Sequence, residues 1–145
     1  MTWFNYFGLA VMAVIMIPNI IFAVKNKAGF VNAYKNKPAE ICEQIGRYTC
    51  FALMIFNVPY ACMGLWFDCA LTVYLCVNGG LCLAYLIFWI VCWNKNGMIK
   101  AVALSVIPSV IFLFSGVILA YIPLIAFAVI FSVCHILISV KNTGI

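Results

Sequence analysis

The sequence predicts an all-α fold, an integral membrane bundle of five transmembrane helices with a short cytoplasmic interfacial helix. Of its 145 residues, 68% are hydrophobic and 8% are charged, whereas a soluble domain has about 45–50% and about 25%. A chain this short cannot bury so much apolar surface in one water-soluble core. Lipid is therefore the expected solvent for most of the chain. This excludes a soluble enzyme, a disordered regulator and a secreted disulfide scaffold.

The first span is expected at about residues 3–24, and a basic, polar stretch follows it. The second half of that stretch, residues 38–47, begins with proline and carries Glu40 and Glu43 in its first turns. This pattern is typical of a helix N-terminus. Charged and apolar residues fall on different faces, so we expect an amphipathic helix that lies at the membrane interface and runs into the second span. Glu43 and Arg47 form an interfacial anchor pair in this interpretation, with a clamp for a headgroup or substrate as the alternative.

The second and third spans are expected at about 48–66 and 69–93, joined by a tight turn at residues 67–68. A polar link follows at residues 94–100. The second span contains Asn57 and Pro59.

The last two spans come from residues 101–140, which carry no charge apart from that of His135 when it is protonated. One span needs about 20 residues, so this block predicts two helices, at about 101–118 and 122–140. The turn between them is expected just before Pro123, because proline suits the first turn of a helix. The whole chain then forms a single transmembrane domain.

The distribution of basic residues predicts the orientation. With five spans, all eight lie on one side, and Asp68 lies on the other. Positive charge stays on the cytoplasmic side, so we expect a cell (inner) membrane protein with its N-terminus outside and its C-terminus inside. Lipid headgroups explain the net charge of +5, and no nucleic-acid partner is expected. The basic residues are Lys25, Lys27, Lys35, Lys37, Arg47, Lys95, Lys100 and Lys141.

Two asparagines lie inside the expected second and third spans. Asn57 and Asn78 are about equally far from the turn at residues 67–68, so a helical hairpin would place them at one depth, close enough to bond directly or through one water. Gly79 and Gly80 would let a neighbouring helix approach closely there. Polar side chains in hydrocarbon are functional candidates by default.

The last two spans repeat this symmetry. Ser109 and Ser132 mirror each other about the second turn, and His135 lies one turn further along the same stripe as Ser132. Together with the two asparagines, these residues predict a polar layer at mid-membrane. They are the candidate ligand-binding residues, namely Asn57, Asn78, Ser109, Ser132 and His135. Simple hydrogen bonding between helices is the competing interpretation of the layer.

The remaining chemistry predicts no metal site, no cofactor and no catalytic group. The chain has eight cysteines but no C-x-x-C spacing, and its one histidine directly follows Cys134, which makes chelation by the two difficult. Cys62 and Cys69 flank the outer turn, and whether they pair stays open. The predicted spans contain no acid–base or nucleophile–base pair, so a membrane enzyme is the least favoured function.

Two functions remain after these exclusions. In the first, the polar layer lines an intramembrane cavity that binds or transports a small neutral or amphipathic molecule. In the second, the chain is a structural or accessory membrane subunit, and the layer only fixes helix packing. The bilayer is the expected partner in both, and self-association or another membrane protein is an open alternative.

Three stretches resemble small uncharacterised membrane proteins of bacteria. They cover MIPNIIFAVKNK (16–27), EQIGRYTCFALMIFN (43–57) and SVIPSVIFLFSG (105–116). The resemblance implies a bacterial membrane protein and brings no activity with it. Length and span number are also similar to the translocator/tryptophan-rich sensory protein family, which implies a five-helix bundle for porphyrins and sterol-like ligands. That family's Trp- and Pro-rich motifs are missing here, so none of its residue roles is carried over.

Overall fold

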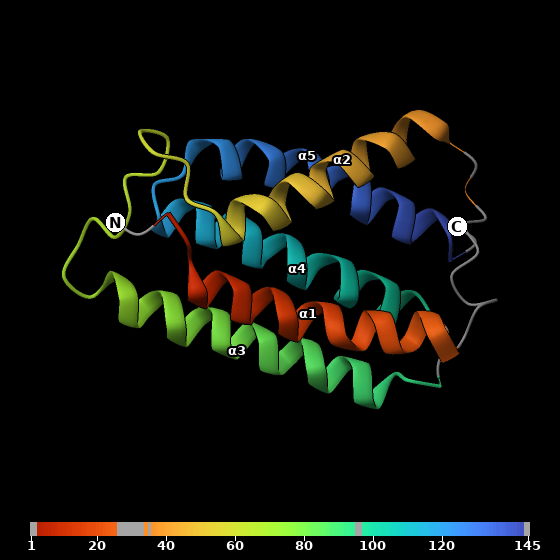
Figure 1. The fold of residues 1–145 in the computed structure, drawn as a ribbon. Helices are drawn as coiled ribbons and strands as arrows, with labels where there is room; N and C mark the ends of the chain where they lie inside the picture. Colours follow the sequence, from red (N-terminus) through yellow and green to blue (C-terminus); the bar gives the residue numbers. More distant parts are fainter. Residues whose placement is uncertain (1–2, 26–33, 35, 95–96, 144–145) are drawn as a thin grey trace.

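The structure, a computed structural model, describes residues 3–25, 34, 36–94 and 97–143. Five helices make up almost all of this part of the chain (Figure 1). They are α1 (Tyr6–Lys25), α2 (Lys37–Ile55), α3 (Ala70–Val91), α4 (Met98–Ile118) and α5 (Ile122–Lys141).

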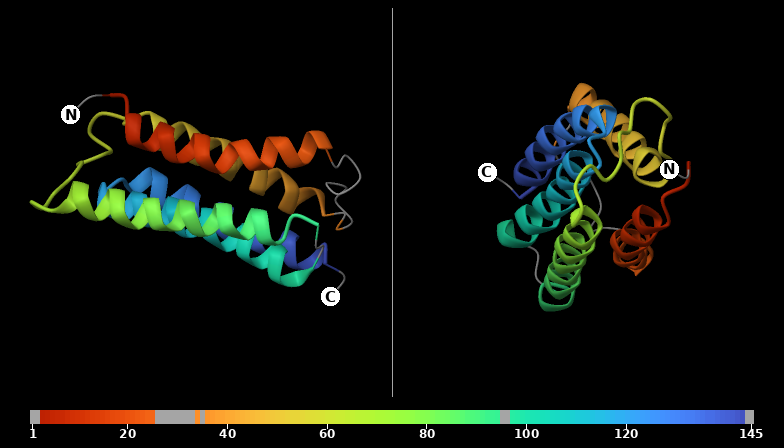
Figure 2. Two further views of the ribbon diagram at one scale, coloured as in Figure 1. Left: turned by 90° about the horizontal axis from the view of Figure 1, so that it is seen from below. Right: turned by 90° about the vertical axis from the view of Figure 1, so that its left-hand side faces the viewer.

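The helices run up and down along one long axis, so the two chain termini lie at opposite ends of the bundle (Figure 1). Neighbours around the ring follow the order α1, α2, α5, α4 and α3, and α3 contacts α1 again. Figure 2 shows the ring from one end. Large apolar side chains such as Leu83, Ile90 and Val133 remain exposed on its outside. Such a surface fits contact with lipid.

Four of the five helices are long and apolar enough to cross a membrane, namely α1, α3, α4 and α5. The fifth, α2, carries four charged residues, so its composition differs from that of the other four. They are Lys37, Glu40, Glu43 and Arg47. Length and composition therefore support four of the five expected spans. The uncharged block from residue 101 to 140 forms two helices, as expected.

The expected end of the second span near residue 66 is wrong, although the interfacial helix does run into that span as one continuous helix, α2. Its N-cap is Asn36, whose Oδ1 accepts a hydrogen bond from the Ala39 amide at 3.4 Å. α2 ends at Ile55, and residues 56–69, called the connecting segment from here on, are not helical. Pro59 opens a turn in this segment, and Tyr60 has a φ of 67°, which a helix does not tolerate.

Backbone pairing holds the start of the connecting segment against the N-terminus. Phe4 and Phe56 form an isolated antiparallel bridge. The Asn5 amide donates to the Ile55 carbonyl at 2.7 Å, and the Asn57 amide donates to the Trp3 carbonyl at 2.8 Å. These bonds satisfy backbone groups that a continuing helix would otherwise have used, which explains why an apolar run can leave the helical conformation.

The turn between α4 and α5 holds the rest of the connecting segment. Cys62 and Tyr121 form an isolated antiparallel backbone bridge, and the Gly64 amide donates to the Leu119 carbonyl at 2.9 Å. The buried Tyr121 hydroxyl accepts from the Val58 amide at 3.0 Å and donates to the Phe56 carbonyl at 3.2 Å. The N-terminus, the connecting segment and this turn are thus held together by backbone hydrogen bonds at one end of the bundle. We call this the closed end.

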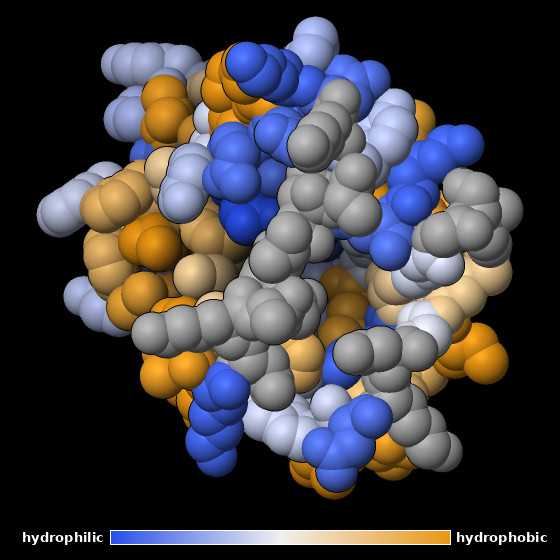
Figure 3. Space-filling view, turned by 90° about the vertical axis from the view of Figure 1, so that its right-hand side faces the viewer, coloured by the Kyte–Doolittle hydropathy of each residue, from blue (hydrophilic) through white to orange (hydrophobic). Residues whose placement is uncertain are grey.

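The opposite end of the bundle is basic. Lys25 is the last residue of α1, Lys37 the first of α2, and Lys141 the last of α5, while Lys100 lies in the first turn of α4. Hydrophilic side chains gather there (Figure 3). Asp68 lies at the closed end, as the predicted segregation of charge requires. Arg47 lies further along α2, and the other three basic residues fall outside the described part of the chain.

Candidate functional site

One cluster of ionisable side chains lies between α2 and α5. Glu43 is only 3% exposed. Its Oε1 atom accepts hydrogen bonds from both Nε and Nη2 of Arg47, with the Nε bond at 3.0 Å. The same oxygen lies 2.9 Å from Nδ1 of His135. A buried carboxylate therefore joins two basic side chains from two helices.

A close helix contact brings these residues together. At Gly46 of α2, an added Cβ would lie only 3.0 Å from the Cβ of Phe131 on α5. The helices are antiparallel, so Glu43, one turn before Gly46, meets His135, one turn after Phe131. The Phe131 and His135 rings stack at 4.7 Å with 20° between their planes. The imidazole is thus fixed from two directions.

The contact with Glu43 also fixes which nitrogen of His135 carries a proton. An ionised carboxylate only accepts hydrogen bonds, so Nδ1 must donate. Burial raises the pKa of Glu43, but the His135 hydrogen bond and the Arg47 charge outweigh this, and the pKa falls below its ordinary value. Glu43 therefore stays ionised at neutral pH. Nε2 of His135 has no hydrogen-bond partner among the described residues.

The cluster is partly open and lies towards the basic end. The side chains of His135 and Arg47 are 22% and 32% exposed. Glu43 lies six residues after the start of α2, and His135 six residues before the end of α5, which is about 9 Å along each helix. The site therefore lies inside the bundle but nearer to its basic end.

The two asparagines take other partners. Asn78 is buried and exchanges hydrogen bonds with Ser115 of α4, where its Nδ2 donates to Oγ at 3.2 Å. Asn57 lies in the connecting segment, and its Oδ1 is 3.8 Å from the Cys62 thiol. The prediction that Asn57 and Asn78 lie at one depth of a helical hairpin is wrong, because α2 ends before Asn57.

The two serines bond to carbonyl groups of their own helices. Ser109 donates to the Ser105 carbonyl at 2.8 Å, and Ser132 donates to the Ala128 carbonyl. Of the five candidate residues, the structure brings only His135 into a charged cluster. Asn78 belongs to a different contact, between α3 and α4.

The expectation for Gly79 and Gly80 is also wrong. An added Cβ at either position would meet nothing within 4 Å. Both glycines lie on the exposed face of α3, so the close helix approach occurs at Gly46 instead.

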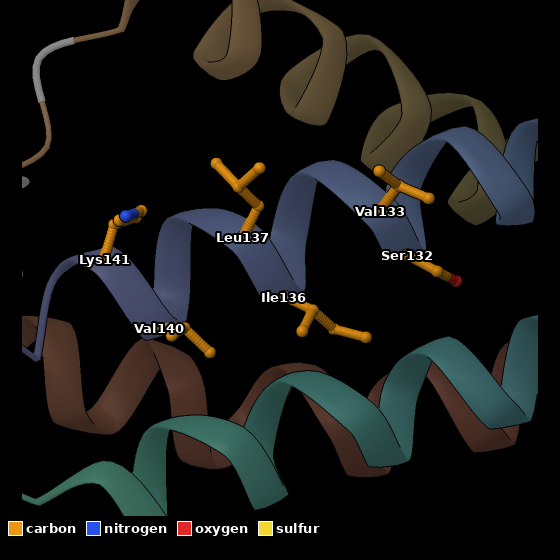
Figure 4. A pocket seen from close by; sticks show the side chains of 6 residues that line it. All are labelled: Ser132, Val133, Ile136, Leu137, Val140 and Lys141. Carbon is orange, nitrogen blue, oxygen red and sulfur yellow. The ribbon is translucent and has the colours of Figure 1, made fainter. Parts of the chain in front are cut away.

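Two apolar depressions lie on the outer surface. The first is lined by residues of α5 alone, from Ser132 to Lys141 (Figure 4). The second lies between α3 and α4, with Phe88 on one side and Met98 on the other. Neither is lined by Asn57, Asn78 or His135. The depressions face outwards, where lipid chains would cover them.

None of the eight cysteines forms a disulfide, including Cys62 and Cys69 at the closed end. Burial raises the pKa of the Cys62 thiol, although a backbone hydrogen bond from Gly64 opposes the shift. Cys69 is exposed. Within the described residues, no three metal-binding side chains come together.

The sequence did contain a signal for the link between Glu43 and His135. The buried positions of α2 are Glu43, Gly46, Cys50 and Met54, spaced by three or four residues. That spacing marks one helix face that runs without a break across the supposed boundary at residue 48. A glutamate on this face has to meet a partner inside the bundle.

The fold and the cluster define a class of protein: a helical, multi-pass membrane protein with an ionisable cluster between two of its helices. Comparison with protein-family models, with curated proteins and with solved structures finds no match for this chain.

Proposed function

We propose that this membrane protein binds a small neutral or amphipathic molecule at the cluster of Glu43, Arg47 and His135. The observation that supports this most strongly is the state of His135. Glu43 and Phe131 fix its ring, Nδ1 is committed to Glu43, and Nε2 remains available on a partly exposed side chain. A carboxylate-oriented imidazole is a pre-organised hydrogen-bond acceptor.

The cluster also indicates the chemistry of the ligand. Nε2 of His135 would accept a hydrogen bond from a hydroxyl or an N–H group. Arg47 directs Nε and one Nη2 bond at Glu43, which leaves further guanidinium N–H groups for an acceptor on the ligand. The negative charge of Glu43 offsets that of Arg47, so the site does not demand an anion. The apolar surfaces of α2 and α5 would take the rest of the molecule.

The test is ligand-dependent thermal stability of the purified protein in detergent. The probes are a sterol-like alcohol, a porphyrin and a neutral lipid such as diacylglycerol. A ligand that binds only the folded form stabilises it by about 2.7 kcal/mol at a hundredfold excess over its Kd. We expect one probe to raise Tm for the wild type but not for His135→Ala. Leu83→Ala, a change at an exposed apolar position of α3 away from the cluster, is the matched control.

Because His135 is the only histidine, its imidazole ¹⁵N signals report on binding without assignment work. We expect the bound probe to shift the Nε2 signal. If no probe shifts Tm or this signal, or if His135→Ala responds as the wild type does, the binding proposal is wrong.

A structural or accessory subunit is the second candidate function. The internal bonds of Asn78 to Ser115, and of Ser109 and Ser132 to their own helices, favour it, because these polar groups already have partners. In this case the polar residues only fix helix packing. Failure of every probe, together with co-purification of a defined membrane protein or a second copy after cross-linking, would support it.

We also propose that the basic end faces the cytoplasm. The four described lysines at that end support this orientation through the positive-inside rule. The N-terminus would then be outside and the C-terminus inside the cell membrane.

A further inference from the structure

The buried face of α3 is polar along most of its length. Its members are Tyr74, Asn78, Cys82, Tyr85 and Trp89, which follow one another by three or four residues. Each carries a hydroxyl, amide, thiol or indole N–H group. The face points towards α1 and α4 in the interior of the bundle, and we call it the polar face of α3.

Only part of this face has hydrogen-bond partners. Asn78 is paired with Ser115, and the Tyr85 hydroxyl accepts from Nδ2 of Asn19 on α1 at 2.7 Å. Two donors on the same face have none, namely the Tyr74 hydroxyl and the Trp89 indole Nε1. These two residues are 2% and 4% exposed.

The unpaired donors do have polar neighbours. Ser115 and Asn5 lie near hydrogen-bonding range of the Tyr74 hydroxyl, but neither meets the geometry of a hydrogen bond to it. Tyr85 stands in the same relation to Trp89. A buried donor without a partner costs about 1–3 kcal/mol, so native structures pair almost all of them, with ordered water where protein groups do not reach.

We infer that the polar face of α3 binds a file of water molecules between α1, α3 and α4. Successive members are about 4.5–6 Å apart along the helix axis, which matches two hydrogen bonds of about 2.7–3.2 Å through one bridging water. From Tyr74 to Trp89 the file spans about 22 Å. This site takes water or another small uncharged hydrogen-bonding molecule, and it is independent of the cluster at His135.

Water reaches the file from the basic end. The Lys100 ammonium group lies 5.2 Å from the centre of the Trp89 ring and donates to the Trp93 carbonyl at 3.2 Å. Lys100 belongs to the first turn of α4 at the basic end of the bundle and is 8% exposed. An ammonium group there brings hydration next to the indole.

The first experiment is NMR measurement of exchange between water and the four tryptophan indole N–H groups, in the full chain in nanodiscs. Trp89→Phe assigns the signal, and the exposed Trp66 provides the reference for free exchange. We expect the Trp89 indole to exchange with water on the same seconds timescale as Trp66, despite its burial. Protection of Trp89 for hours in a folded sample overturns the inference.

The second experiment compares the stability of Tyr74→Phe with that of the wild type. A hydroxyl bonded to a bound water stabilises the fold, so the inference predicts a lower Tm for Tyr74→Phe. A dry, unpaired hydroxyl destabilises it, so an equal or higher Tm overturns the inference. Tyr60→Phe, at a fully exposed tyrosine, is the matched control and leaves Tm unchanged.

Discussion

Glu43 combines three properties that rarely occur together in a helical membrane protein: it is acidic, buried, and bonded to two different helices. One of its carboxylate oxygens, Oε1, contacts both Arg47 on α2 and His135 on α5. The desolvation of a carboxylate is costly, and such a group persists only when partners compensate it. Removing Glu43 therefore leaves two polar side chains without an acceptor.

We expect Glu43→Ala to destabilise the protein by about 3–5 kcal/mol, the usual cost of breaking a buried ion pair from one side. Glu43→Gln keeps the shape and one acceptor oxygen, so its effect is smaller. Denaturant unfolding in detergent measures both. Gln44→Ala, at an exposed polar position of the same helix, is the control, and equal effects at Gln44 and Glu43 would contradict the role given to the cluster.

The stability that Glu43 contributes depends on pH. Its pKa in the folded protein lies below its ordinary value of about 4.5. A carboxyl with a lowered pKa stabilises the fold fully above its unfolded pKa, and this contribution disappears as pH falls through the folded pKa. The stability difference between wild type and Glu43→Gln should thus be constant near pH 7 and shrink below about pH 4.5. A difference that grows on acidification would show that the pKa is raised instead.

At the scale of the helix, the contact between α2 and α5 depends on Gly46. An added Cβ would meet the backbone of Phe131, with its Cα and N both at 3.1 Å. Backbone atoms cannot rotate away, so the two helices have to separate. Separation also pulls Glu43 away from His135.

We expect Gly46→Ala to lower stability by about 1–3 kcal/mol, the cost of overpacking. Gly80→Ala is the matched control, because it has open space at its Cβ and gains about 0.5–1 kcal/mol of helix propensity. The two alanine variants should therefore change Tm in opposite directions. The same sign for both would mean that α2 and α5 are not in close contact.

The sequence predicts helices well where apolar runs are long and interruptions are few, as in α1, α3, α4 and α5. It fails after Ile55, because the connecting segment is as apolar as a span. Its backbone bonds go to Trp3 and Leu119, far away in the sequence, and hydropathy does not register such pairing. The site was half predictable: the spacing of Glu43 and Arg47 indicates their pair, but the meeting with His135 depends on tertiary register.

At the scale of the whole molecule, charge and covalent reactivity differ between the two ends. Lysines lie at the basic end, while Asp68 and Cys69 lie at the closed end. Cys69 is an exposed thiol, whereas burial raises the pKa of nearby Cys62 and reduces its thiolate fraction.

A membrane-impermeant maleimide on intact cells should therefore modify Cys69 within minutes and Cys62 much more slowly. Mass spectrometry of chymotryptic peptides distinguishes the two, because Trp66 and Phe67 lie between them. Cys69→Ser should abolish most of the labelling. A reporter that functions only in the cytoplasm should be active when it is fused after Ile145. Labelling of Cys69 only after lysis would reverse the proposed orientation.

The bond between Glu43 and His135 has a consequence for biosynthesis. When α2 leaves the ribosome, the histidine that will share its buried carboxylate has not been made, because α3 and α4 come first. Insertion of α2 into lipid by itself is unfavourable, because the helix carries four charged residues. α2 should thus wait at the membrane surface and join the bundle together with α5. Chains truncated before α5 should leave α2 open to proteases.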